Sequence, residues 1–81
     1  MEKRIGSALI IVADKLNADR INQVLSKHAT IILGRMGLPA RERDVAIISI
    51  VFEGTTDEIG ALTGQLGRIE GVMVKSLVIK S

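Results

Sequence analysis

The residues best suited to bind a ligand follow one another between positions 34 and 43. They are Gly34, Arg35, Gly37, Arg41 and Arg43. Glycines that leave the backbone uncovered beside arginines can seat an anion such as a carboxylate or a phosphate, because guanidinium groups and bare N–H groups both donate to it. The alternative, which we favour, is a solvated hairpin whose charges keep an edge strand from pairing with other chains.

A second group of small residues recurs at helical spacing. Gly60, Gly64 and Gly67 fall at positions i, i+4 and i+7. Each glycine inside a helix costs about 0.5–1 kcal/mol relative to alanine, so three of them weaken the helix. The functional interpretation is a close approach by another helix, another chain or a ligand. The alternatives are contact with the neighbouring helix of the same domain, or tolerance on an exposed surface, and the sequence does not decide between them.

Residue constellations for catalysis or metal binding are absent from the sequence. The chain has no cysteine and a single histidine, His28, which lies on the apolar side of a predicted helix. Because transition metals prefer several histidine ligands, we expect a structural role for His28 and no metal site. Phosphate-binding and dinucleotide-binding glycine motifs do not occur, nor does a G-x-S-x-G nucleophile motif. We therefore expect no enzyme activity and no cofactor.

The composition indicates one small domain spanning residues 1–81. Hydrophobic residues make up 47% and charged residues 25%, and the net charge is only +2 at pH 7. Nucleic-acid binding needs clustered positive charge or aromatic stacking residues, and Phe52 is the one aromatic residue. The apolar run at 8–13 is too short for a signal peptide or a membrane span. We expect a cytoplasmic protein without nucleic-acid or membrane partners.

The elements that must position these residues are four strand-like and two helical segments. Strands are predicted over 4–13, 30–38, 44–53 and 72–80, and helices over 17–29 and 55–69. Residues 39–43 are predicted as a charged turn, because Pro39 cannot continue a ladder. Thr55 and Glu58 have capping-box spacing at the start of the second helix, and Gly71 is placed to end it in a left-handed conformation.

The order β-α-β-β-α-β predicts an α+β, ferredoxin-like sandwich. Its four-stranded antiparallel sheet carries both helices on one face. The first and third strands are the most continuously apolar, so they are predicted at the centre of the sheet. Charged residues at Arg35, Lys75 and Lys80 mark the second and fourth strands as edges.

Apolar residues occupy both faces of the predicted sheet, although helices cover only one. In the third strand, Val45, Ile47 and Val51 alternate with Ile48 and Ile50. A monomer would expose an apolar patch on the order of several hundred Å², and such patches mark interaction surfaces. We expect a homo-oligomer, a dimer or tetramer, joined through the helix-free face; the alternative is a monomer with an unusually apolar surface.

Three segments carry a resemblance to a known family. They are residues 30–43 (TIILGRMGLPARER), 45–51 (VAIISIV) and 54–75 (GTTDEIGALTGQLGRIEGVMVK). The chain resembles the iron-only hydrogenase system regulators, small ACT-like proteins, over nearly its whole length. The resemblance implies a single ACT-like domain of ferredoxin-like fold, from an anaerobe, associated with iron-only hydrogenase maturation. It brings no catalytic residues.

Related ACT-like domains sharpen these expectations. The group includes the ligand domain of the nickel-responsive repressor, which binds metal through His and Cys ligands that this chain lacks. It also includes ACT domains that bind amino acids beside a glycine-containing turn after the first strand, and residues 14–18 of this chain contain no glycine. No segment is left for a DNA-binding helix-turn-helix. We expect a non-enzymatic regulator that senses a small anionic ligand or binds a protein partner. The alternatives are an interaction module without a small ligand and, with less support, a small ferredoxin-like enzyme.

Overall fold

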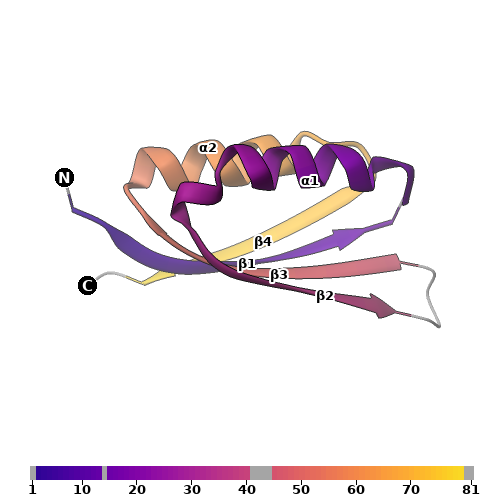
Figure 1. Cartoon of the computed structure of the whole chain (residues 1–81), viewed down its shortest axis with the longest axis horizontal. Coiled ribbons are helices and arrows are strands. Elements are labelled where there is room, and N and C mark those ends of the chain that lie inside the picture. Colours follow the sequence, from indigo (N-terminus) through magenta and orange to yellow (C-terminus); the bar gives the residue numbers. More distant parts are fainter. Residues whose placement is uncertain (1, 14, 41–44, 80–81) are drawn as a thin grey trace.

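The computed structural model describes residues 2–13, 15–40 and 45–79. Its strands are β1 (Arg4–Val12), β2 (Ile32–Ala40), β3 (Val45–Gly54) and β4 (Val72–Ile79), and its helices are α1 (Ala18–Lys27) and α2 (Thr56–Gly67). Two 3-10 turns, η1 (Lys15–Asn17) and η2 (Ala29–Ile31), flank α1. Both helices lie on one face of the sheet (Figure 1), which confirms the predicted ferredoxin-like sandwich.

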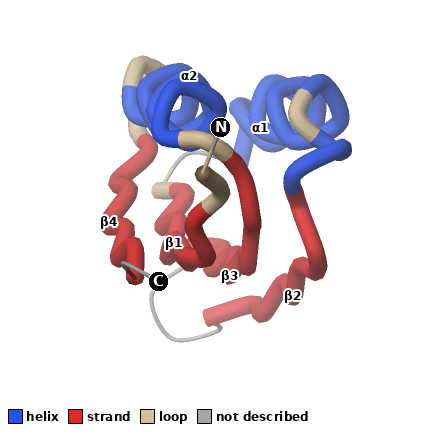
Figure 2. Tube along the Cα trace, turned by 90° about the vertical axis from the view of Figure 1, so that its left-hand side faces the viewer, coloured by secondary structure: helices blue, strands red, loops and turns tan. Residues whose placement is uncertain are grey.

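The strand order is β2-β3-β1-β4, so the two most apolar strands are central, as predicted. All neighbouring strands pair antiparallel, and Ile10 of β1 lies between Ile48 of β3 and Val74 of β4. Seen along the strands, the helices form one layer and the sheet the other (Figure 2). The opposite face of the sheet carries no second layer within the described residues.

The core lies between the helices and the sheet. Among the described residues it contains no buried polar side chain. Its members are Ala8, Ile10, Val12, Ile21, Leu25, Ile31, Ile50, Phe52, Ile59, Leu62, Leu66 and Ile69. They come from alternate positions of β1 and β3, from one side of each helix, and from Ile31 in η2 and Ile69 after α2. Val24 of α1 packs against the core at its margin.

Glycine is required at two positions, at Gly6 because there is no room for a Cβ and at Gly71 because its φ is positive. A Cβ at Gly6 of β1 would lie 2.6 Å from the carbonyl oxygen of Leu77 and 2.7 Å from Cε1 of Phe52. Gly71 has a φ of 78°, so its left-handed conformation is as predicted. The prediction that it ends the second helix is wrong, because α2 ends at Gly67 with Arg68 as its C-cap, and Gly71 lies in the turn before β4. At the other end of α2, the backbone N–H of Glu58 donates to Thr55 Oγ1, and Glu58 Oε1 accepts from the Thr55 N–H. The predicted capping box is therefore confirmed.

The second strand differs from the prediction at both ends. Residues 30 and 31 belong to η2, so β2 begins at Ile32. The prediction that Pro39 ends the strand is wrong, because β2 runs to Ala40 and Pro39 pairs with Ala46. β2 is an edge strand, and an edge tolerates a residue without an N–H because only one of its sides pairs with a neighbour.

Candidate functional site

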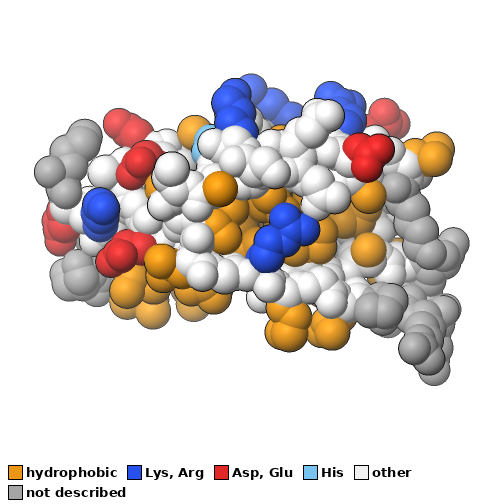
Figure 3. Space-filling model, in the orientation of Figure 1, with side chains coloured by type: hydrophobic (Ala, Val, Ile, Leu, Met, Phe, Trp, Pro, Cys, Tyr) orange, Lys and Arg blue, Asp and Glu red, His pale blue; other side chains and the backbone are white. Residues whose placement is uncertain are grey.

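The face of the sheet that carries no helices is apolar and exposed. We call it the open face. Its exposed large side chains are Ile5, Leu9, Met36, Leu38, Val51, Met73, Leu77 and Ile79. Their exposed fractions run from 42% for Val51 to 67% for Met73 and Leu77. Figure 3 shows hydrophobic side chains projecting from the underside of the molecule, below the sheet.

The strand register places these side chains in rows across the sheet. One row joins Leu38, Ile47, Ile11 and Met73, in the order β2, β3, β1 and β4. The next row contains Met36, Ser49, Leu9 and Lys75, so polar groups interrupt the apolar surface near its middle. The expected apolar character of both sheet faces is thus confirmed, and the second face is left uncovered by the described residues.

The exposed area of the chain is large for its mass. The chain of 8.7 kDa exposes 5610 Å², whereas a compact monomer of that mass exposes about 4,700 Å² by the usual scaling of surface with mass. The excess is roughly 900 Å². A two-layer sandwich explains this excess, because no element among the described residues covers the second face of its sheet.

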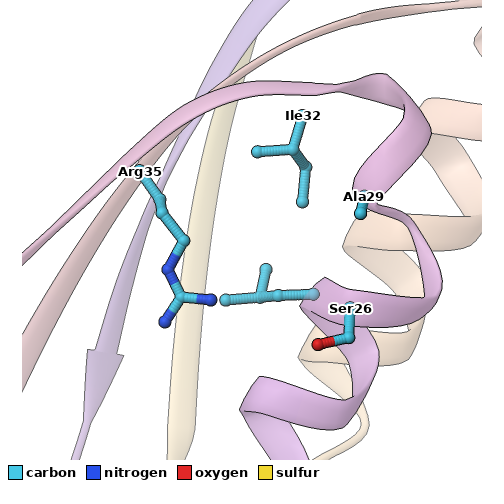
Figure 4. Close-up of a pocket in the computed structure, with 5 residues that line it drawn as sticks. Ser26, Ala29, Ile32 and Arg35 are labelled. Atoms are coloured by element: carbon cyan, nitrogen blue, oxygen red, sulfur yellow. The ribbon is translucent and has the colours of Figure 1, made fainter.

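A groove between α1 and β2 contains the one arginine of the 34–43 group that the structure describes. Its cavity of about 170 Å³ is lined by Leu25, Ser26, Ala29, Ile32 and Arg35. Arg35 reaches from β2 towards α1 (Figure 4), and its Nη2 donates to Asn22 Oδ1 at 2.9 Å. The guanidinium group therefore lies across a hollow whose other described lining is apolar except for the hydroxyl of Ser26.

The glycines of the same group separate onto different faces. Gly34 pairs with Val51 on the open face, whereas Gly37 pairs with Ile48 on the helix side, together with Arg35. A Cβ at either glycine would meet no atom within 4 Å, so the backbone is uncovered at both. Arg41 and Arg43 lie outside the described residues. Only Arg35 and Gly37 are therefore brought to one side of the strand.

The glycine stripe of α2 makes no close contact within the described part of the chain. Gly60, Gly64 and Gly67 are exposed, and a Cβ at each would find open space within 4 Å. The buried residues of α2 lie on its other side. The stripe is therefore not explained by packing against α1 or the sheet, and a role in ligand or partner contact stays a prediction.

A second groove, between the two helices, was not found from the sequence. It has a cavity of about 240 Å³, lined by Arg20, Gln23, Val24, Gln65, Arg68 and Ile69. His28 is half-buried near this groove, and its Nε2 lies 3.2 Å from Oε1 of Gln65. The contact joins α1 to α2, which fits the structural role expected for His28. The sequence feature that could have indicated this groove is the pair Arg20 and Arg68, one at the exposed margin of each helix.

Neither groove has the donor set of a metal centre. Across residues 2–13, 15–40 and 45–79, no three His, Cys, Asp or Glu side chains gather closely enough to hold a metal ion. Within the same ranges, neither helix has the length and apolarity needed to cross a membrane. The features available for binding are thus the open face, the two grooves and the exposed glycine stripe.

Comparison with known proteins places the whole chain. A family profile described as "TM1266-like: Iron-only hydrogenase system regulator, putative" matches residues 4–76. The solved structure of TM1266 from Thermotoga maritima is 44% identical, with a TM-score of 0.90, and the match covers 98% of this chain and 100% of that one. No curated protein matches the sequence.

More distant structures share the fold alone. The C-terminal domain of the MgtC protein from Mycobacterium tuberculosis is 14% identical, with a TM-score of 0.72, over 93% of this chain and 86% of that one. CPII, a nitrogen regulatory PII-like protein from Thiomonas intermedia K12 solved with ADP, AMP and bicarbonate, is 14% identical. Its TM-score is 0.53, over 99% of this chain and 96% of that one.

Proposed function

Because the chain belongs to the family of iron-only hydrogenase system regulators, we propose that it is a non-enzymatic regulator that acts as a homo-oligomer and senses a small ligand. Family membership supports a regulatory role in the iron-only hydrogenase system. The PII-like fold of a nitrogen regulatory protein supports the same general role. The oligomer and the ligand are argued below from this chain's own surfaces.

The main observation in support of a homo-oligomer is the exposed apolar surface of the open face. Leu9, Leu77 and Met73 are each about half exposed or more in the single chain. Stable protein interfaces bury about 800 Å² per partner, which is close to the excess of roughly 900 Å² that this chain exposes. A second copy presenting the same face fits this area, since two-fold interfaces use one patch on both subunits.

Opposite charges on the open face suit a self-complementary contact. Lys75 of β4 and Glu53 of β3 lie on it, in the same registers as Leu9 and Ile5 of β1. When two copies face each other, the lysine of one can pair with the glutamate of the other. The long lysine stem also packs along apolar surface while its ammonium group reaches the rim.

An interaction module without a small ligand is the second candidate function. The same open face would then receive a different protein, since an exposed apolar patch of this size marks a contact surface without stating the partner. The mass of the isolated chain separates the two candidates, because only the oligomer covers the face by itself.

The solution mass by light scattering on a size-exclusion column tests the oligomer. We expect a multiple of 8.7 kDa for the unmodified chain and a monomer for Leu9→Glu, which puts a charge at the middle of the open face. Leu16→Glu is the matched control, because Leu16 is 88% exposed and lies in η1, away from the sheet. Its mass should stay that of the unmodified chain.

Two results would contradict this assignment. A monomeric unmodified chain refutes the homo-oligomer and favours the interaction module. If Leu9→Glu leaves the oligomer intact, the interface between the subunits does not lie on the open face. Sensing is tested separately by thermal shifts with amino acids, nucleotides, anions and metal ions, where a flat response throughout would refute it.

A further inference from the structure

We propose that the groove between α1 and β2 binds a short aliphatic monocarboxylate, with the carboxylate on Arg35 and the hydrocarbon chain against Leu25 and Ile32. This inference rests on the proposed sensing function and names the class of ligand for it. It follows from the shape of the groove, from the unused donors of one arginine and from the absence of a second charge in the described lining.

The groove is open because small residues line its wall beside the end of α1. Ala29 and Ser26 form the wall at the end of α1, and Arg35 and Ile32 form the wall on β2 (Figure 4). Further along β2, Gly37 adds no side chain on this side, and a Cβ there would meet no atom within 4 Å. Figure 3 shows the result as a hollow with hydrophobic side chains on its floor and a cationic side chain lying across it.

The floor of the groove belongs to the margin of the core. Leu25 is buried, and Ile32 is a partly buried side chain packed against the core. Apolar surface of this kind gains free energy when a hydrocarbon chain replaces water on it. The groove therefore suits a ligand that is apolar over most of its length.

Arg35 supplies an anion site at the mouth of this apolar surface. A guanidinium group has five N–H donors, and the recorded partner of Arg35 is the neutral amide of Asn22. No acidic side chain is among the described residues that line the cavity. The positive charge is thus held in place by a side-chain amide while donors remain for a carboxylate, which guanidinium groups bind in a bidentate manner.

The lining argues against other anions. An amino acid would bring an ammonium group, which needs a carboxylate partner that the described lining does not provide. Inorganic phosphate would gain nothing from Leu25 and Ile32 and would lose hydration beside them. At about 30 Å³ per non-hydrogen atom, the liquid volume of water, the cavity of about 170 Å³ holds roughly six such atoms. A branched acid of four carbons has six non-hydrogen atoms and matches this volume, and one of five carbons fits when its carboxylate lies on Arg35 at the mouth of the groove.

A titration with isovalerate, followed by ¹H–¹⁵N NMR of the full chain, tests the proposal. We expect saturable shifts centred on Ser26, Ala29 and Ile32. Arg35→Gln should weaken binding by about tenfold or more, since a charge-assisted pair is lost. Isovaleramide, which has the same shape without the charge, should bind as weakly to the unmodified chain.

Two further variants separate the groove from a general charge effect. Ala29→Leu keeps Arg35 but fills the cavity, and it should abolish the shifts. Arg68→Gln removes an arginine from the groove between the helices and should leave the affinity unchanged. If Arg68→Gln weakens binding as much as Arg35→Gln does, the site lies between the helices and the proposal is wrong.

The same samples distinguish failure of the groove from failure of the proposed function. An unmodified chain that is oligomeric but shows no saturable shift with isovalerate refutes the groove alone, and leaves Arg35 as a link between β2 and α1. A monomer that binds isovalerate supports the groove and refutes the oligomer. Equal binding of isovalerate and isovaleramide would overturn the role of Arg35.

Discussion

Replacing Gly6 with alanine should destabilise the protein, while the same replacement at Gly60 should stabilise it. Both glycines lie inside regular elements, Gly6 in β1 and Gly60 in α2. In the strand the new Cβ would meet Phe52 and the carbonyl oxygen of Leu77, whereas in the helix it would meet no atom within 4 Å. The chemical change is identical, so the surroundings decide the sign.

The size of the effect at Gly6 follows from the contact distances. Carbon atoms settle about 3.5 Å apart, and the new Cβ would start 2.7 Å from Cε1 of Phe52, so the ring must retreat by about 0.8 Å. The carbonyl oxygen of Leu77, at 2.6 Å, belongs to the backbone of a paired strand and must move as well. Overpacking of this kind costs roughly 1–3 kcal/mol, and the loss of glycine entropy in the unfolded chain offsets about 0.4–1 kcal/mol of that.

Gly6→Ala should therefore lower the free energy of unfolding by about 1 kcal/mol, which corresponds to a fall in Tm of roughly 4–8 °C for a domain of this size. Gly60→Ala should raise the free energy of unfolding by about 0.5–1 kcal/mol. Urea unfolding of both variants at one protein concentration measures the two effects, since self-association also changes apparent stability.

The reasoning fails if Gly6→Ala is as stable as the unmodified chain, or if Gly60→Ala loses stability by a similar amount. A lower solution mass for Gly60→Ala would have a different meaning. It would show that another chain approaches the glycine stripe of α2, as its spacing first suggested.

The remaining predictions concern the cap of α2 and the core. Thr55→Ala should lower the free energy of unfolding by about 1 kcal/mol, measured by urea unfolding, because the Glu58 N–H loses its acceptor. Hydrogen bonds from the backbone N–H and the side chain of Thr55 hold the pKa of Glu58 below its ordinary value of 4.5. The stability that this carboxylate contributes is therefore present above pH 4.5 and is lost as the pH falls through the lower folded-state pKa. The urea midpoints of the unmodified chain and of Glu58→Gln should converge in acid, and a difference that stays constant with pH would contradict this. Leu62→Ala, at a fully buried position, should cost roughly 2–5 kcal/mol, whereas Leu16→Ala, at an 88% exposed one, should leave thermal stability within about 0.5 kcal/mol.

Much of the fold could be predicted because its signals are local or periodic. The capping box at Thr55 and Glu58 needs only four consecutive residues, and the left-handed conformation of Gly71 belongs to the short turn directly before β4. Alternation along β1 and β3 divided the residues of each strand between two faces, but because both faces are apolar it did not show which one the helices cover. The end of β2 was missed at Pro39 although the strand was predicted at an edge, because an edge strand can continue through a proline and only the strand register shows that it does so here.

The candidate site depended more on contacts across the fold. The sequence grouped Gly34, Arg35 and Gly37 by proximity along the chain, but strand alternation sends Gly34 to the open face. The partner of Arg35, Asn22, lies 13 residues away on α1, and nothing in the local pattern links them. The groove between the helices was missed for the same reason, since its two arginines belong to different elements.

The sequence by itself determined the order of the elements and the apolar character of both faces of the sheet. These properties depend on residue type and spacing within one element. The tertiary structure alone decided that a Cβ is forbidden at Gly6 and free at Gly60, and that Arg35 crosses an apolar groove. Such facts depend on distances between elements, which the packing of all the core side chains sets together, so no single stretch of sequence contains them.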